Sequence, residues 1–236
     1  MRDYCIRPAG PDDLDGARAL MLDTVYRDFG TGYVPRWHGD IIDPVAAYLL
    51  PVRHTLLVAI EGGGREGGAG GEVVATAALD SRGPVYPPNP RHVAERYPSG
   101  ATAQLRRVYV RREHRRRGLA RRLVGELLAF AVADGGYRSV YLHTDPAVEG
   151  AEGFWRSLGT VVHDEREKAN GGQGVVHFDV PLDALVPTSS VATSSSVVAS
   201  VTPVGSATAI TSAISSTSSV PDPRSQPRSQ PRPTDR

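Results

Sequence analysis

Cysteine and long apolar runs are both scarce in this chain of 236 residues, and each scarcity excludes a class of protein. The single cysteine, Cys5, rules out an intramolecular disulfide and a zinc site built on several cysteines. No stretch approaches the roughly 20 apolar residues of a membrane span, and residues 1–10 lack the apolar core of a signal peptide. We therefore expect a cytoplasmic protein that has no metal centre and no membrane partner.

An excess of one charge is also missing. Lysine and arginine together number 27, and aspartate and glutamate number 26, so the formal net charge is only +1. So close a balance gives no whole-chain argument for binding nucleic acid, and only local clusters of charge are informative. With 40% hydrophobic residues, the chain is long enough to bury one sizeable core.

Hydrophobic periodicity predicts an α/β domain over residues 1–186. A strand, a long helix and another strand follow one another in its second half, so these two strands should be parallel. In order along the chain, the predicted segments are a strand at 4–7, a helix at 12–28, an irregular loop at 30–43, a short helix at 44–50, strands at 54–60, 72–79 and 104–110, a helix at 118–134, a strand at 139–144, a helix at 148–158, and strands at 160–163 and 175–180.

Three segments fall outside this pattern. Residues 62–71 are rich in glycine but lack the Gly-Lys-Ser/Thr ending of a phosphate-binding loop, so we expect a hairpin tip. Residues 80–103 hold five prolines, which forbid a long regular element and favour a lid or a wall of a substrate pocket. Residues 187–236 are rich in Ser, Thr and Pro with a basic end, which predicts disorder, and an interaction segment and a dispensable extension are both open.

Residues 105–128 give the clearest indication of function. They have the pattern of a strand, an arginine-rich turn and a helix that begins near Gly118. Backbone N–H groups at a helix N-terminus have no intrahelical partner, and the helix dipole favours negative charge there. The turn therefore predicts a binding site for a pyrophosphate. The alternative interpretation of its arginines is a solvated basic face or a nucleic-acid patch.

The same turn resembles a family signature. Residues 115–120, RRRGLA, match the Arg/Gln-x-x-Gly-x-Gly/Ala motif of the GCN5-related N-acetyltransferase (GNAT) superfamily, with Arg115, Gly118 and Ala120 at its fixed positions. The order of predicted elements over about residues 4–182 is also similar. The resemblance implies a mixed, mostly antiparallel sheet with a central parallel strand pair, flanked by about four helices. It also implies an acetyl-CoA-dependent N-acetyltransferase that attaches an acetyl group to an amine by direct attack on the thioester.

For acetyl-CoA as cosubstrate, the resemblance implies that the pantetheine arm pairs with the backbone of the central strand, as an added strand would. Its partners would be Val108, Tyr109 and Val110, and one of their N–H groups would face the thioester oxygen. The residues expected around the pyrophosphate are Arg115, Arg116, Arg117, Gly118, Leu119, Ala120 and Arg121. The expected acceptor is a small-molecule amine or a peptide, nucleic acid is not an expected partner, and a homodimer is left open.

The groups that move protons are less well marked. Relatives often carry a glutamate where this chain has Gln104, which can hydrogen-bond a substrate but cannot accept its proton. They also carry a tyrosine acid where it has Trp155 and an asparagine where it has Val148. His143 has the side chain of a base that works near neutral pH, with a structural histidine and a water relay as alternatives. Tyr33 is a candidate substrate contact. These departures leave a second hypothesis open, a non-catalytic acyl-CoA sensor or interaction module.

Overall fold

The computed structural model describes residues 3–62, 71–166 and 173–185. Most of the glycine-rich tip at 62–71 and all of the predicted tail at 187–236 lie outside the described residues, so the predictions made for them stay predictions. Within the described ranges, no helix is both long enough and apolar enough to cross a membrane.

Seven strands form one mixed sheet in the order β1-β2-β3-β4-β5-β7-β6. Among these strands β4 and β5 are parallel neighbours, and every other neighbouring pair is antiparallel. This confirms the predicted mixed sheet with a central parallel pair. The strands are β1 (Tyr4–Pro8), β2 (Thr55–Glu61), β3 (Val73–Asp80), β4 (Thr102–Val110), β5 (Ser139–Thr144), β6 (Thr160–Asp164) and β7 (Val176–Val180).

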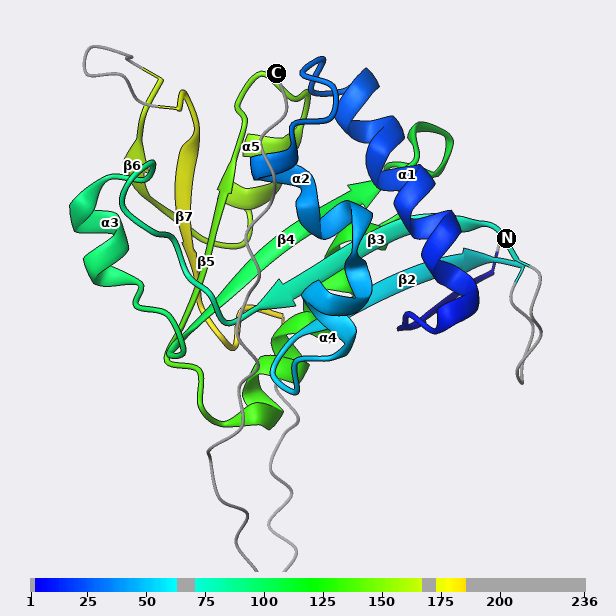
Figure 1. Cartoon of the computed structure of the whole chain (residues 1–236), viewed down its shortest axis with the longest axis horizontal. Coiled ribbons are helices and arrows are strands. Elements are labelled where there is room, and N and C mark those ends of the chain that lie inside the picture. Colours follow the sequence, from blue (N-terminus) through cyan, green and yellow to red (C-terminus); the bar gives the residue numbers. More distant parts are fainter. Residues whose placement is uncertain (1–2, 63–70, 167–172, 186–236) are drawn as a thin grey trace, which may run out of the picture. The chain divides into compact units, whose positions relative to one another are not determined.

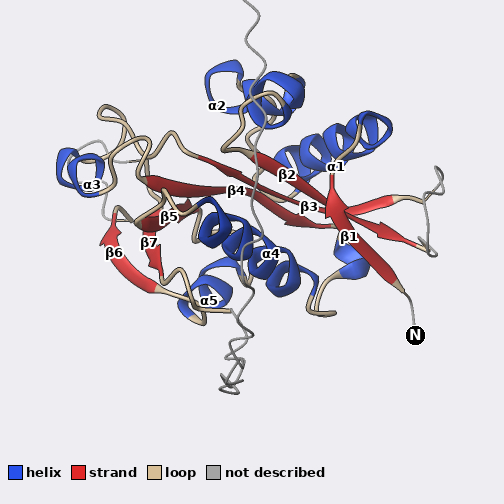
Figure 2. Ribbon diagram, turned by 90° about the horizontal axis from the view of Figure 1, so that it is seen from below, coloured by secondary structure: helices blue, strands red, loops and turns tan. Residues whose placement is uncertain are grey.

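Helices cover both faces of the sheet (Figure 2). One face carries α1 (Leu14–Arg27) and α2 (Pro35–Ile42), and the other carries the long α4 (Leu119–Asp134) and the short α5 (Ala151–Arg156). The short α3 (Arg91–Arg96) lies beside β6 and β7 (Figure 1). Shorter turns are the 3-10 turns Pro11–Asp13 and Arg112–His114 and the π-helical turn Val45–Leu49.

One prediction for the N-terminal half is wrong. Residues 30–43 are predicted above to be irregular, but eight of them form α2. Pro35 fits the first helical position, where its missing N–H is not needed. His38 and Ile41, three residues apart, turn inward and are buried, and His38 Nδ1 accepts a hydrogen bond from the Val34 N–H at 2.9 Å. The helix is therefore specified by burial and a local cap rather than by a long apolar stripe.

The core beneath α4 is aliphatic. Leu119, Leu123 and Leu127 recur at the spacing of one helical face and are buried against the sheet. On the opposite face, α1 packs on β2 and β3 through residues such as Met21. Further along that face, toward β5 and β7, the buried side chains become polar. They are Asp80, Gln104, Tyr141 and His177.

Candidate functional site

The parallel strands β4 and β5 diverge shortly after they begin (Figure 1). Beyond three paired positions, β4 continues to Val110 and β5 to Thr144 without pairing to each other. Edge groups of a strand that lack a partner can hydrogen-bond an extended ligand, as in an added strand. The three pairs are Thr102 with Ser139, Ala103 with Val140, and Gln104 with Tyr141.

A bulge interrupts β4 just beyond the last of these pairs. The register against β3 shifts between Arg106 and Tyr109, and Arg107 has a φ of +52°, in the left-handed region that side chains other than glycine rarely adopt. Thr76 Oγ1 on β3 donates a hydrogen bond to the Arg107 carbonyl at 2.9 Å. Because a bulge bends and redirects its strand, β4 leaves the direction of β5 here.

The side chain of Arg107 anchors this bulge to α2. Its Nε and Nη2 donate to the two carboxylate oxygens of Asp40 at 2.8 and 2.7 Å, and Nη2 also donates to the Trp37 carbonyl at 2.5 Å. Both charged side chains are only 9% exposed. Burial alone would raise the pKa of Asp40, but hydrogen bonds and charge from Arg107, with a hydrogen bond from the Tyr48 hydroxyl, lower it to about 2.

The turn after β4 has unused backbone donors. Arg116 and Gly118 both have positive φ, +60° and +76°, and the Arg122 N–H donates back to the Gly118 carbonyl as α4 begins. In the described part of the chain, none of the N–H groups of residues 116–120 has a protein acceptor. A Cβ on Gly118 would meet no atom within 4 Å, so there is open space at this helix N-terminus. Free N–H groups, the helix dipole and open space fit an anion such as a pyrophosphate.

A hollow of about 450 Å³ lies at this turn. It is formed by the end of α1, the turn, and the segment that follows β5. Its arginines and its open side are compatible with a phosphate-bearing ligand. The lining residues are Asp28, Arg112, Arg115, Arg116, Ala147, Val148 and Glu149.

Asp28 forms ion pairs with two of the arginines that line this hollow, Arg112 and Arg115. Arg112 Nη2 donates to its carboxylate at 2.5 Å, and Arg115 Nη2 donates to the other carboxylate oxygen. Burial would raise the pKa of Asp28, but the two guanidinium groups outweigh it and lower that pKa. Arg115 Nε also donates to the Val110 carbonyl at 3.0 Å. The predicted charge contact of Arg115 is thus directed at the protein, whereas Arg116 is exposed on the wall of the hollow.

The other side chains predicted at the turn have different surroundings. Leu119 is buried in the core and Ala120 is half-buried, so both offer only backbone. Arg117 Nη2 donates to the Glu113 carbonyl at 3.4 Å. Arg121 Nη2 donates to Ser157 Oγ at 3.3 Å, directly after the end of α5.

The three predicted partners of the pantetheine arm use their side chains for packing. Val108 and Val110 contact the core beneath α4. Tyr109 points to the opposite face, where its ring lies 5.8 Å from that of Phe29 between centroids. Their backbone is the part that can face a ligand in the opening between β4 and β5.

His143 lies on β5, on the other side of this opening. Its side chain is exposed and points to the same sheet face as Tyr141, two residues earlier. The surrounding protein, and next the positive charge of Arg106 on β4, lower the pKa of His143. The direction of this shift keeps the imidazole neutral near pH 7.

A second hollow of about 450 Å³ lies along α2. Of the two predicted substrate contacts, Gln104 is only 2% exposed and accepts from Arg106 Nη2 at 3.3 Å, while Tyr33 is half-buried with its ring 6.1 Å from that of His38. Neither side chain lines the hollow. The residues that do are Pro35, Arg36, Trp37, Gly39, Asp40, Asp43, Ala46, Ala47, Arg82 and Arg106.

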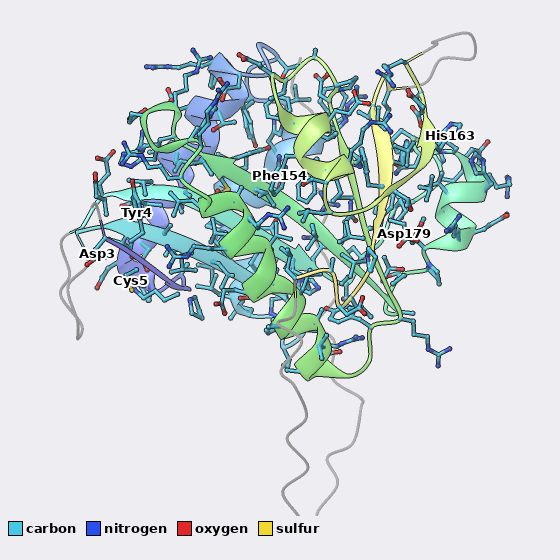
Figure 3. The ribbon with its side chains drawn as sticks, turned by 180° about the vertical axis from the view of Figure 1, so that it is seen from behind. Asp3, Tyr4, Cys5, Phe154, His163 and Asp179 are labelled. Atoms are coloured by element: carbon cyan, nitrogen blue, oxygen red, sulfur yellow. The ribbon has the colours of Figure 1, made fainter. Side chains whose placement is uncertain are left out.

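Trp155 is part of the core rather than of the site. It is 7% exposed, and its ring lies 4.8 Å from that of Phe154 between centroids on α5, where Figure 3 marks Phe154. Val148, at the position where relatives carry an asparagine, lines the hollow at the turn instead. Within the described residues there is no cluster of three or more His, Cys, Asp or Glu side chains placed to hold a metal ion.

The divergence of the parallel strands β4 and β5 and the open N-terminus of α4 are compatible with the resemblance to acetyl-CoA-dependent transferases. Residues 22–160 match the sequence model of the acetyltransferase (GNAT) family, which is more than half of the chain. The chain therefore belongs to the GNAT family of N-acetyltransferases, which use acetyl-CoA.

Solved structures share this fold. An acetyltransferase of the GNAT family from Staphylococcus aureus Mu50 has a TM-score of 0.58 at 11% identity, covering 76% of this chain and 99% of that one. An acetyltransferase from Streptococcus agalactiae has a TM-score of 0.53 at 14% identity, covering 75% and 97%. An N-acetyltransferase from Staphylococcus aureus Mu50 has a TM-score of 0.52 at 19% identity, covering 76% and 99%. At such identities the likeness shows the fold alone. A search of curated protein sequences finds no match.

Three residues of the site escaped the sequence analysis: Arg107, Tyr141 and His177. Arg107 could have been found from the sequence, because it is a charged residue in the interior of a predicted strand. Tyr141 stands two residues before His143, which places both on one face of a strand. The sequence pattern does not indicate His177, because its contact with Tyr141 depends on the pairing of β5 with β7.

Proposed function

We propose that this enzyme transfers the acetyl group to the neutral amine of a small molecule, or of a peptide, by direct attack of the nitrogen on the thioester carbon. The observation that supports this is the opening between β4 and β5, with the anion site of residues 115–120 beyond β4 and His143 on the facing strand. Acetyl-CoA supplies the activated acetyl thioester. The residues of the chain supply binding, orientation and proton transfer.

The cofactor-binding roles divide between backbone and side chain. The backbone of Val108, Tyr109 and Val110 orients the arm, and one of their N–H groups stabilises the oxygen that becomes negatively charged. The N–H groups of the turn bind the pyrophosphate together with the guanidinium of Arg116. Arg115 acts indirectly, because its contacts with Asp28 and with the Val110 carbonyl hold the turn against α1 and β4.

We assign proton acceptance from the amine to the neutral imidazole of His143, directly or through a water molecule. The departing sulfur needs no protein acid in this scheme, because a thiol is acidic enough to leave with water as the donor. This agrees with the burial of Trp155 in the core. The second hollow, along α2, is the proposed binding site of the acceptor.

Calorimetry with acetyl-CoA tests the cofactor roles. Arg116→Ala should weaken binding by about 1.5 to 3 kcal/mol, since it removes one charged hydrogen bond. Gly118→Asp should abolish binding, because it places a carboxylate at the anion site on a residue with positive φ. Arg138→Ala is the matched control, an exposed arginine beyond the other end of α4. Absence of a binding heat for the unmodified chain would contradict the proposal.

Release of coenzyme A thiol over a panel of amines tests the reaction itself. Turnover with any physiological amine supports the enzyme and eliminates the acyl-CoA sensor suggested by Gln104, Val148 and Trp155. Binding of acetyl-CoA without thiol release across small amines and peptides would favour the sensor instead. His143→Gln should lower the turnover number about a hundredfold or more if the ring is the base.

A further inference from the structure

Behind His143, a row of buried polar groups runs into the protein. The Tyr141 hydroxyl lies 3.5 Å from His143 Nδ1 and 2.7 Å from His177 Nδ1, and His177 Nε2 lies 2.9 Å from Glu165 Oε1. Tyr141 and His177 are fully buried, and Glu165 is 5% exposed. We call Tyr141, His177 and Glu165 the buried row. It joins β5, β7 and the segment after β6 and ends at the one exposed ring, that of His143.

The carboxylate sets the direction of every hydrogen bond in the buried row. Glu165 accepts from His177 Nε2 and, through its other oxygen, from the Gln173 N–H at 2.6 Å. Burial lowers the pKa of His177 more than the nearby carboxylate raises it, so the ring is neutral. A neutral ring that carries its proton on Nε2 has a lone pair on Nδ1.

The Tyr141 hydroxyl has a single proton and can donate only one hydrogen bond. It is donated to His177 Nδ1, because that nitrogen is 2.7 Å away and needs a donor, whereas His143 Nδ1 is 3.5 Å away. The lone pairs of the Tyr141 oxygen are left for His143. An oxygen that can only accept selects the form of His143 that carries a proton on Nδ1.

We propose that the buried row has a positioning role in the reaction. It holds the exposed ring of His143 in the tautomer with the proton on Nδ1, so that Nε2 presents a lone pair to the acceptor amine. In the opposite tautomer Nε2 would present an N–H group and could not accept a proton. This inference rests on the proposed function, in which His143 takes the proton of the amine.

The charged and titratable neighbours are compatible with this arrangement. Arg106 and Arg107 of β4 face His143 and disfavour its protonated form. On the far side, the ring of His163 on β6 lies 5.7 Å from that of His177, and the ring of His92 on α3 lies 4.7 Å from that of His163. Figure 3 marks His163 on this side of the sheet. These contacts are between rings, and they leave the two nitrogens of His177 to Tyr141 and Glu165.

Tyr97, directly after α3, offers a matched control for substitution of Tyr141. Its ring lies 5.0 Å from that of Tyr141, and both residues are almost fully buried. Its hydroxyl, however, donates to Asp179 at 2.7 Å and is not part of the buried row. Tyr97→Phe and Tyr141→Phe therefore each delete one buried hydroxyl that donates one short hydrogen bond, but only the Tyr141 hydroxyl also contacts His143.

Nitrogen NMR on the histidine-labelled full chain measures the tautomer directly, with His143→Gln used to assign the signals. For His143 we expect the shift of a protonated nitrogen at Nδ1 and of a bare nitrogen at Nε2. Tyr141→Phe should bring the two shifts together as both tautomers become populated, and Tyr97→Phe should leave them unchanged. A wild-type spectrum with the proton on Nε2 would overturn the proposal whether or not the enzyme is active.

Kinetics supply the second readout. Tyr141→Phe should lower kcat about ten- to hundredfold with an unchanged KM for acetyl-CoA, while Tyr97→Phe stays within about twofold. Equal losses of kcat in both variants would mean that the buried row has only a structural role, and this would contradict the proposal. Full activity of His143→Gln would contradict the base assignment itself, even if the tautomer is as expected.

A second pair of variants guards against misfolding of Tyr141→Phe. His177→Gln keeps an amide oxygen that can accept from Tyr141 and an amide N–H that can donate to Glu165, so the tautomer of His143 should be retained. His177→Leu removes both groups and should lose it. A retained tautomer in a folded His177→Leu variant would overturn the inference.

Discussion

From the end of β3 to β7, the two faces of the sheet carry opposite kinds of side chain. In this part, residues that face α4 are aliphatic or aromatic, and their direct chain neighbours on the other face are polar and still buried. Buried polar groups must be paired, so this part of the second face is a network of specific contacts, whereas the part beneath α1 is a packed apolar layer. The neighbouring pairs are Leu79 and Asp80, Leu105 and Gln104, Leu142 and Tyr141, and Phe178 and His177.

We infer that the α4 face stabilises the fold, whereas the polar part of the opposite face carries the groups proposed to act in the reaction. Changes on the α4 face should therefore alter stability without altering the chemistry. Changes on the polar face should alter both, because a polar group that loses its partner is costly and also misplaces a functional neighbour.

The largest effect is expected from Arg107→Met. It leaves the carboxylate of Asp40, 9% exposed, without its cation, and removal of one partner of a buried ion pair costs about 3 to 5 kcal/mol. Urea unfolding measures the loss, and thiol release should fall as well because the bulge in β4 is no longer tied to α2. Arg138→Met, at an exposed arginine outside both hollows, is the control. A loss of stability without any effect on catalysis would contradict the proposed link between stability and chemistry on the polar face.

Leu123→Ala should come next. The side chain is fully buried beneath α4, and its truncation is expected to cost about 3 kcal/mol through lost burial and a residual cavity. The turnover number per folded molecule should be unchanged. Val132→Ala, at a half-exposed position of the same helix, serves as the reference for a valine truncation without a cavity. A change in kcat would show that the two faces are not separable.

Lowering the pH should reduce the free energy of unfolding through the ion pair of Asp40. The pKa of Asp40 is about 2 in the folded chain against an ordinary value of 3.8, so folding favours its ionised form. That contribution, about 2 kcal/mol, is fully present above pH 4 and is lost as the pH falls toward 2. Unfolding at pH 5, 4, 3 and 2 measures it, with Asp40→Asn as the reference that lacks this share of the pH dependence. Parallel curves for both chains would refute the assignment.

The smallest effect has the opposite sign. Gly125 lies inside α4, and a Cβ there would meet Leu185 at an ordinary contact distance of 3.8 Å. Gly125→Ala should therefore stabilise the fold by about 0.5 to 1 kcal/mol, because glycine costs the helix conformational entropy. Thermal unfolding should show a higher midpoint at unchanged kcat. Destabilisation would mean that the contact with Leu185 is tighter than its distance indicates.

The features that were predicted correctly depend on residues close together in the sequence. β4, the arginine-rich turn and α4 follow each other directly along the chain, so the strand period, Gly118 and the helix period together indicate the anion site. α2 was missed because it is short and is defined by the burial of His38 and Ile41 rather than by a long periodic stripe. α3 was not predicted either, and the helix predicted at 44–50 is a π-helical turn. The remaining elements follow the predicted order, with α5 shorter than predicted.

The partners of His143 were not predictable from the sequence. Tyr141 meets His177 because β7 pairs with β5 in one register, and Glu165 meets His177 across the β6–β7 connection. A shift of one residue in that register would turn His177 to the opposite face. Contacts between residues 36 and 12 positions apart in the chain depend on tertiary packing, about which a single sequence contains little information.

The ion pair of Arg107 with Asp40 joins α2, the wall of the proposed acceptor site, to β4, the strand proposed to bind the cofactor, as one mechanical unit. Asp40 and the Trp37 carbonyl belong to α2, which lines the second hollow, while the backbone of Arg107 belongs to the bulge that opens β4. Retargeting this enzyme to a different amine by rewriting α2 would therefore disturb cofactor geometry unless Asp40 is kept. The exposed position Arg36 is free of that constraint, and it is where new acceptor preferences can be selected at low cost to the fold.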